Sequence, residues 1–276
     1  MPREETKPFP QEILDWYTNT YKESNRLTGG LGLIEQVRIR ELILRHLCPP
    51  PAVVYDLGGG TGAHSFWLAG LGYMAHLVDI VPLHIEQARL AAEEPQAPQL
   101  ASLRVGDARK LEFEDESADA VLLFGPLYHL TERDDRLQTL AEARRVLRPG
   151  GVLFAYAISR YASTIYGLLH GLVWDADYLK MINLELASGQ HRKPENLNVF
   201  ITAFFHHPDE LRAELDEGGM LLDEIVGIQG PGWIVPDFEA NLKSAERLDI
   251  LVEIARRMEK DPVVSPHMLA VARRPG

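Results

Sequence analysis

A dense glycine cluster follows a short apolar run and an acidic residue. The stretch from Val53 to Gly62 reads Val-Val-Tyr-Asp-Leu-Gly-Gly-Gly-Thr-Gly, and a second acid, Asp79, closes the next apolar run. Because glycine has no Cβ and tolerates positive φ, its backbone can turn sharply after a strand and approach a ligand closely. A carboxylate at a strand end can accept hydrogen bonds from sugar hydroxyls. These residues predict a nucleotide site; the alternative is a plain turn between strand and helix.

Two later apolar runs end in similar residues. One is followed by Gly106-Asp107-Ala108, and the other ends in Phe124-Gly125-Pro126-Leu127-Tyr128-His129. Ligands on parallel sheets bind outside the carboxyl ends of the strands. Four consecutive strand ends with polar or glycine residues therefore predict one shared ligand site.

Strands and helices must alternate to bring these ends to one edge. Apolar runs predict strands at 52–57, 74–80, 101–106, 119–124 and 151–157, with helices at 62–71, 83–93 and 136–147 between most of them. This alternation is typical of a parallel sheet with right-handed crossovers and helices on both faces. The fold class is therefore α/β, doubly wound and Rossmann-like.

Further elements flank this core. Helical periodicity occurs at 11–27 and 33–47, and the later segments predict a helix at 209–217, a strand at Met220–Gly227, a helix at Ala240–Met258 and a last strand at His267–Ala272. We expect one domain over 1–276, divided into an N-terminal helical cap at 1–50, a cofactor-binding core at 51–157, an insertion at 158–205 and a C-terminal part of the sheet at 206–276.

Composition limits the function. The 276-residue chain has a formal charge of −12, which disfavours a general nucleic-acid grip because phosphate binding needs a basic face. A single cysteine excludes an internal disulfide framework, and no apolar run is long enough to span a membrane. The charged start at Met1–Glu5 lacks the apolar core of a signal peptide. We expect a cytoplasmic, soluble protein without a membrane partner.

The segment 158–205 interrupts the alternation with aromatic and apolar residues typical of two helices, followed by a polar loop at Gly189–Asn198. An insertion at the ligand edge of the sheet is well placed to form a lid or a substrate pocket. We expect Tyr161, Trp174 and His206 to contact the substrate. The alternative is a packing subdomain or a homodimer contact, since exposed apolar surface marks either.

The motifs resemble those of class I S-adenosylmethionine-dependent methyltransferases, strongly over residues 50–160 and in layout over the rest. The first loop of that family reads acid-x-Gly-x-Gly-x-Gly, which is matched by Asp56, Gly58, Gly60 and Gly62. The family signature before the fifth strand is matched by Leu147-Arg148-Pro149-Gly150-Gly151. The resemblance implies a seven-stranded sheet with an antiparallel last strand, S-adenosylmethionine as cofactor and S-adenosylhomocysteine as product.

The resemblance also implies roles for individual residues. Asp79 would bind both ribose hydroxyls, and Asp107 with Ala108 would contact the adenine amino group and ring nitrogen. Asp56 would orient the loop or meet the cofactor's ammonium group. The remaining cofactor contacts expected along the strand ends and in the N-terminal helices are Gly59, Ile80, Phe124, Gly125, Tyr21 and Arg26. Similar enzymes often place an arginine on the methionine carboxylate, and Arg26 is the candidate here.

Two other functions compete. Gly58-x-Gly60-x-x-Ala63 also satisfies the dinucleotide fingerprint, so an NAD(P)-binding Rossmann oxidoreductase is one alternative. Gly62, Gly106-Asp107-Ala108 and the glycine pair before the fifth strand have no role in that fingerprint. A non-catalytic S-adenosylmethionine-binding protein is the other alternative, because a fold does not fix an activity.

The fourth strand end narrows the acceptor. Phe124-Gly125-Pro126-Leu127-Tyr128 is not the Asn/Asp-Pro-Pro-aromatic motif of enzymes in the wider family that methylate base amino groups or a glutamine amide. Cytosine C5 enzymes carry Pro-Cys there, whereas Cys48 precedes the first strand. A small-molecule acceptor is therefore expected, by direct displacement. The sequence does not identify that molecule or the atom methylated.

Histidines and aromatic residues are the candidates for acceptor chemistry. His129 lies just past the fourth strand and is the candidate general base, with a loop-packing role as the alternative. Tyr17 in the N-terminal helical part is a candidate substrate contact. No metal is expected, because the adjacent histidines 206 and 207 lack a matched acid or cysteine spacing.

Overall fold

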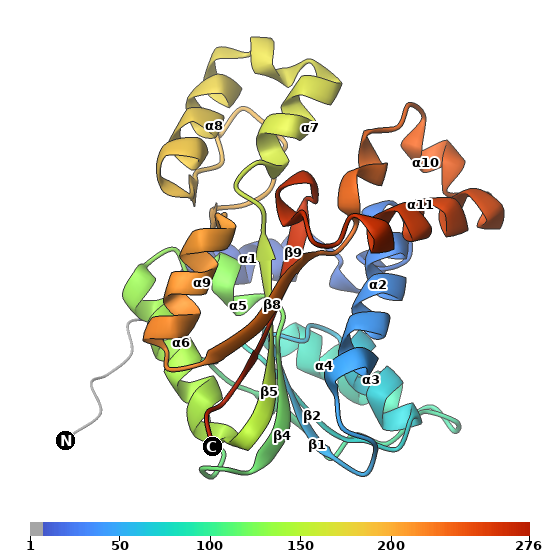
Figure 1. Cartoon of the computed structure of the whole chain (residues 1–276), viewed down its shortest axis with the longest axis vertical. Coiled ribbons are helices and arrows are strands. Elements are labelled where there is room, and N and C mark those ends of the chain that lie inside the picture. Colours follow the sequence, from blue (N-terminus) through green and yellow to red (C-terminus); the bar gives the residue numbers. More distant parts are fainter. Residues whose placement is uncertain (1–7) are drawn as a thin grey trace.

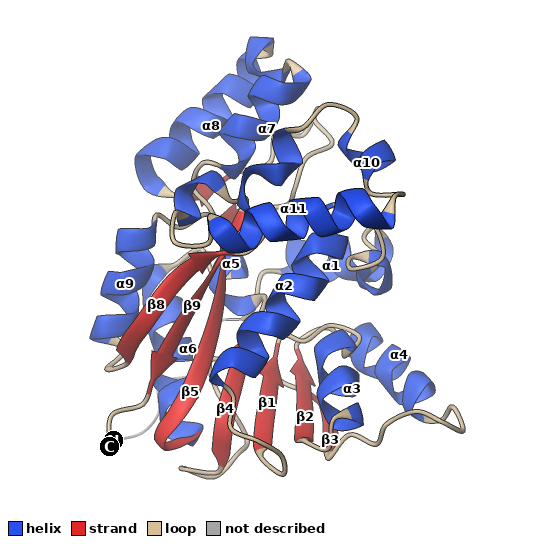
Figure 2. Ribbon diagram, turned by 45° about the vertical axis from the view of Figure 1, so that its right-hand side comes forward, coloured by secondary structure: helices blue, strands red, loops and turns tan. Residues whose placement is uncertain are grey.

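Seven strands form one twisted sheet in the computed structural model, which describes residues 8–276 (Figure 2). Their spatial order is β3-β2-β1-β4-β5-β9-β8. The strands are β1 (Val53–Leu57), β2 (Met74–Asp79), β3 (Ser102–Val105), β4 (Ala118–Leu123), β5 (Leu147–Ile158), β8 (Leu221–Gly227) and β9 (His267–Arg273). The first five are parallel, whereas β9 runs antiparallel to both β5 and β8. The expected mostly parallel sheet with an antiparallel last strand is confirmed.

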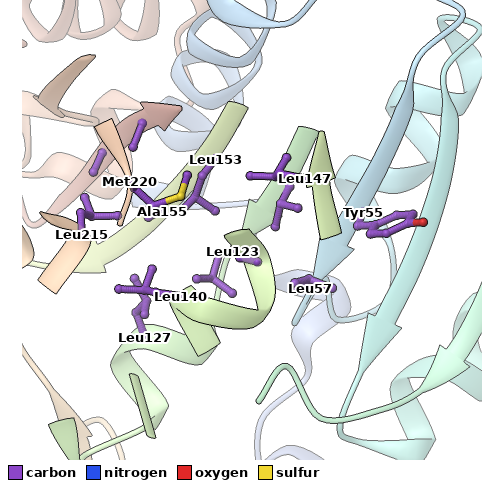
Figure 3. Packing of buried hydrophobic residues seen from close by; sticks show 14 of the residues in the cluster. Tyr55, Leu57, Leu123, Leu127, Leu140, Leu147, Leu153, Ala155, Leu215 and Met220 are labelled. Atoms are coloured by element: carbon purple, nitrogen blue, oxygen red, sulfur yellow. The ribbon is translucent and has the colours of Figure 1, made fainter. Parts of the chain in front are cut away.

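Helices cover both faces of this sheet (Figure 1). They are α2 (Leu31–His46), α3 (Ala63–Gly70), α4 (Pro82–Ala92), α5 (Pro126–His129), α6 (Arg133–Val146) and α9 (Pro208–Glu217). Alternate strand residues point to opposite faces, so Leu57 packs with α6 and α9 while Val54 packs with α2 and α3. Figure 3 shows the first of these layers, where Leu140 and Leu215 face the sheet. Two apolar layers thus hold the strand ends rigidly.

The N-terminal segment consists of α1 (Gln11–Asn19) and the short helix η1 (Glu23–Asn25), which precede α2. Residues 1–7, including the charged start considered above, lie outside the described residues. Ile13 and Tyr17 of α1 pack against Val81 and Ile201, which follow β2 and precede β7. The N-terminal segment therefore lies over the carboxyl end of the sheet.

The insertion after β5 contains two helices, as expected. It comprises α7 (Ala162–His170), η2 (Leu172–Trp174), α8 (Ala176–Ser188) and a small ribbon of β6 (Gln190–His191) with β7 (Ala203–Phe204). Asp175 caps α8 by accepting hydrogen bonds from the backbone N–H groups of Asp177 and Tyr178. Tyr178, Met181 and Ile182 form its own apolar core. In Figure 1, α7 and α8 stand at the top, beyond the carboxyl end of β5.

Two boundaries differ from the sequence expectation. The single helix expected at Ala240–Met258 is divided into α10 (Phe238–Asn241) and α11 (Ala245–Arg257), because the Ser244 side chain caps the second helix. The expected strand start at 151 is also wrong. β5 begins at Leu147 because that residue already pairs with Ala118, and an irregularity in the register accommodates the glycines.

The remaining short helices are η3 (Gly230–Ile234) and η4 (Pro262–Val264). Across residues 8–276 no helix combines the length and apolarity that crossing a lipid bilayer requires.

Candidate active site

An open cavity lies at the carboxyl ends of β1, β2, β3 and β4. The four strand ends picked out from the sequence all contribute to its lining, together with α1, η1 and Tyr156 of β5. The cavity therefore brings the residues of four strand ends together at one ligand-accessible place.

The glycine loop forms one wall. Gly58, Gly59 and Gly60 line the cavity, whereas Gly62 begins α3 from a left-handed conformation. The φ values of Gly58, Gly60 and Gly62 are 73°, 58° and 87°, which residues with a Cβ rarely adopt. A Cβ on Gly60 would lie 2.7 Å from Cγ of Glu23. The loop therefore needs glycine both for its backbone conformation and because Glu23 lies too close to Gly60 for a Cβ.

Asp56 lies beneath this loop and not in the cavity lining. It is fully buried, and its Oδ2 accepts a 2.6 Å hydrogen bond from Ser65 Oγ. Its Oδ1 has no hydrogen-bond partner within the described part of the chain. Burial raises the pKa of Asp56 to about 6, because a carboxylate is poorly stabilised there. Its geometry fits the orienting role better than a direct contact with the cofactor.

Asp79 ties the loop to the second strand. Its Oδ2 accepts a 2.8 Å hydrogen bond from the backbone N–H of Gly60, and its Oδ1 accepts one of 2.8 Å from Val81 N–H. The same Oδ1 lies 3.1 Å from Nδ1 of His84. Asp79 and the adjacent Ile80 both line the cavity. A carboxylate can accept about four hydrogen bonds, so Asp79 retains capacity for a ligand hydroxyl.

Asp107 and Ala108 line the cavity at the exit of β3. The Asp107 carboxylate is engaged with Arg109, whose Nη2 donates a 2.6 Å hydrogen bond to Oδ2. Arg109 also forms an ion pair with Asp135, at 3.2 Å. Because Arg109 is buried, these two acids offset its charge and fix the orientation of Asp107.

The fourth strand end supplies Phe124, Gly125, Tyr128 and His129 to the lining. Gly125 has a φ of 132°, and this turn starts the single helical turn α5. His129 Nε2 lies 2.8 Å from the hydroxyl of Tyr17 on α1, and both residues are buried. His129 Nδ1 has no partner within residues 8–276. Burial lowers the pKa of His129 to about 3, so the imidazole is neutral near pH 7.

Arg26 reaches the cavity from the residue after η1. Its Nε donates a 2.6 Å hydrogen bond to Glu23, and its Nη1 is paired with Glu35 of α2. Despite burial, these two carboxylates hold the pKa of Arg26 well above its usual value. Tyr21 lies outside the main cavity and lines a neighbouring groove between η1 and α4. It packs edge-on against Tyr17, so its contribution is to support that residue.

Three residues expected to contact the substrate are not brought to the cavity. Trp174 is 88% exposed at the far end of the insertion. His206 is fully buried and bonded to Glu214, and Tyr161 packs against His207. Apolar and aromatic content in the insertion does not distinguish its own packing and outer surface from a pocket wall, which explains why the sequence grouped them with the site.

Several lining residues lacked a signal in the sequence. Glu23, His64 and Tyr156 all face the cavity. His64 is 3% exposed, and neither of its ring nitrogens has a hydrogen-bond partner among the described residues. Its position in the first turn of α3, two residues after the last loop glycine, is the one clue available in advance. The other two required knowledge of how η1 and β5 pack.

The comparisons with known proteins agree with this geometry. A family model described as a methyltransferase domain matches residues 55–155. The chain is 34% identical, over 58% of its length, to a ubiquinone/menaquinone biosynthesis C-methyltransferase of Acidiphilium cryptum. It is 28% identical, over 82% of its length and 87% of the relative, to a ubiquinone biosynthesis O-methyltransferase of Xanthomonas axonopodis pv. citri. The chain spans 63% of the first relative's length, and 38% and 50% of two others.

Among solved structures, a SAM-dependent methyltransferase from Methanosarcina mazei superposes with a TM-score of 0.58 at 21% identity, covering 85% of this chain and 97% of that one. This similarity concerns the fold. With the match over residues 55–155 and the curated relatives, it identifies a methyltransferase domain that has the fold of S-adenosylmethionine-dependent methyltransferases.

Proposed function

We propose that this protein transfers the methyl group of S-adenosylmethionine to a small-molecule acceptor. The observation that carries the proposal is the convergence of the glycine loop, Asp79 and Asp107 on one cavity. A loop without side chains suits close approach by the cofactor's methionine part, and the two carboxylates suit its ribose hydroxyls and adenine amine. Ile80, Ala108, Phe124 and Gly125 complete the proposed cofactor contacts.

The sheet argues against the dinucleotide alternative. Dinucleotide-binding sheets of the doubly wound type follow a parallel order 3-2-1-4-5-6. Here the antiparallel β9 is inserted between β5 and β8. The Asp107-Ala108 pair at the third strand end is also outside the dinucleotide fingerprint. An NAD(P)-binding oxidoreductase is therefore the less well supported function for this cavity.

When bound, S-adenosylmethionine would supply an electrophilic methyl group on a positively charged sulfur, for direct displacement by the acceptor's lone pair with S-adenosylhomocysteine as the leaving group. The chain's contribution is alignment and exclusion of water. Tyr17 of α1 and His129 of α5 close the cavity from opposite sides through their 2.8 Å contact. Phe124, Tyr128 and Tyr156 give the acceptor an aromatic surface.

The direction of the hydrogen bond between His129 and Tyr17 determines whether His129 Nδ1 can accept a proton. Nε2 faces the Tyr17 hydroxyl, and Nδ1 is buried without a hydrogen-bond partner among the described residues. If Nε2 donates to Tyr17, the Nδ1 lone pair can accept a proton from the acceptor; if Tyr17 donates, Nδ1 carries hydrogen and cannot. We propose the first tautomer, with His129 as general base and Tyr17 orienting it. The pKa of about 3 limits its strength as a base, so the acceptor's own acidity must assist.

The names of the relatives suggest the acceptor class. The curated relatives are C- and O-methyltransferases of ubiquinone biosynthesis, and another is a malonyl-[acyl-carrier protein] O-methyltransferase. We propose an apolar or aromatic small molecule for this chain, which the aromatic wall supports.

The test is transfer of labelled methyl from S-adenosylmethionine into a metabolite extract, with the Asp79→Ala variant as control. Appearance of labelled product with the wild-type protein and not with the variant supports turnover. Cofactor binding without labelled product from extracts of varied sources would favour a non-catalytic binding protein.

A further inference from the structure

Glu23 lies directly over the glycine loop. A Cβ on Gly60 would meet its Cγ at 2.7 Å and its Oε1 at 3.4 Å, so the Glu23 side chain covers the backbone that the cofactor approaches. Glu23 and Arg26 both line the cavity, and the Glu23 side chain is only 15% exposed. The helical turn η1 thus presents an acid and a base, three residues apart, to the same part of the cavity.

Each of these two side chains has an unused polar atom. Arg26 Nε donates to Glu23 Oε1, and Arg26 Nη1 donates to Glu35. Among the side chains that the structure describes, no hydrogen bond involves Glu23 Oε2 or Arg26 Nη2. One free carboxylate oxygen and one free guanidinium nitrogen therefore remain in a largely enclosed site.

We propose that Glu23 and Arg26 together bind the zwitterionic amino-acid end of the cofactor. Glu23 Oε2 accepts hydrogen bonds from the α-ammonium group, while Arg26 Nη2 donates to the α-carboxylate. This inference rests on the proposed function and adds Glu23 to the binding residues expected for it.

Electrostatics favours this arrangement. A charge removed from water is costly unless it is paired and hydrogen-bonded. The ammonium and the carboxylate, which share one carbon, are matched by a carboxylate and a guanidinium that already touch, so each ligand charge has a partner of opposite sign. Burial raises the pKa of Glu23. An ammonium beside it would favour its ionised form, which is the form that the hydrogen bond requires.

Glu35 positions the arginine. It is 3% exposed and accepts hydrogen bonds from Arg26, from the Tyr156 hydroxyl at 3.1 Å and from Gln229 Nε2 at 3.1 Å. Glu35 lies on α2, and its partners come from the residue after η1, from β5 and from the segment after β8. Arg26 is therefore fixed to the body of the protein while its Nη2 remains available.

The test measures binding and needs no acceptor. Calorimetry compares S-adenosylhomocysteine with its analogue that lacks the α-amino group, on the wild type, on Glu23→Gln and on Glu12→Gln. Glutamine retains an oxygen for Arg26 Nε but loses the charge, while Glu12 is an exposed acid on α1. We expect Glu23→Gln to weaken the binding of S-adenosylhomocysteine about 10- to 100-fold and the binding of the deamino analogue less than about twofold. Glu12→Gln should change neither.

Equal weakening of both ligands, or no weakening of either, would overturn the inference. The affinities of the wild type for the two ligands can also be compared, and this test does not depend on the folding of a variant. The deamino analogue must bind about 10- to 100-fold more weakly than S-adenosylhomocysteine. Equal affinities there would also contradict it. Failure of the proposed function looks different, because the wild type would then bind neither S-adenosylmethionine nor S-adenosylhomocysteine.

Discussion

Replacing Asp79 with asparagine should damage both the loop and the ligand site. Its two carboxylate oxygens accept hydrogen bonds from the backbone N–H groups of Gly60 and Val81, each at 2.8 Å. Asparagine has one acceptor oxygen and one NH₂ group, so one of the two backbone donors must face another donor. The glycine loop would then lose its attachment to β2 or would shift to restore it.

The structure sets the size of this effect. Leaving one buried donor unpaired costs about 1–3 kcal/mol. For a chain of this length, an unfolding entropy of about 2.1 cal/mol/K per residue converts that cost into a drop of roughly 2–5 °C in Tm. Cofactor affinity should fall further, by about 10- to 100-fold, because hydrogen bonds to a charged group contribute about 1.5–3 kcal/mol.

Scanning calorimetry and titration with S-adenosylhomocysteine measure the two effects separately. Asp249→Asn is the matched control, because Asp249 is an exposed acid on α11 far in sequence from the loop. The reasoning is refuted if Asp79→Asn retains both the wild-type Tm and the wild-type affinity. A lower Tm with unchanged cofactor affinity would mean that Asp79 has a structural role and does not bind the ribose.

Three further changes test other parts of the site. Gly59→Ala places a Cβ 2.5 Å from the Asp56 carboxyl. Overpacking of this kind costs about 1–3 kcal/mol, so thermal melts should show a Tm lower by roughly 2–5 °C. Gly29→Ala is the control, because open space surrounds Gly29 and its Tm should not change measurably. Because the pKa of Asp56 is raised to about 6, the wild type should lose stability relative to Asp56→Asn as pH rises from 4 to 7; denaturant unfolding showing the reverse trend would contradict this. His129→Asn should lower kcat on an identified acceptor at least about 100-fold with S-adenosylhomocysteine affinity within about twofold, and near-normal turnover would exclude His129 as the base.

The strand ends could be predicted because their signal is local. A glycine run after an apolar segment and an acid at the next strand end depend on backbone geometry that each short stretch determines for itself. The parallel alternation then placed Asp79, Asp107 and Phe124 at one edge, and all three line the cavity. The sequence could not reveal that Asp56 is buried beneath the loop, since that depends on Ser65 one helical turn into α3.

The cover of the site depends on long-range packing. The Tyr17–His129 contact joins residues 112 positions apart, and Glu35 links α2 with β5 and the segment after β8. Such long-range contacts leave no periodic pattern in the sequence. The sequence assigned aromatic residues of the insertion to the substrate pocket because pockets are often lined by such side chains. Trp174 is one of these residues, but 88% of it is exposed. Composition alone does not say which way an apolar side chain points.

Titration calorimetry of the full chain with S-adenosylmethionine, and separately with NADH, tests the central claim most directly. The cavity described here predicts saturable binding of S-adenosylmethionine at one site per chain, weakened by Asp79→Asn, and no heat with NADH. Binding of NADH together with the absence of any heat from S-adenosylmethionine would contradict the assignment.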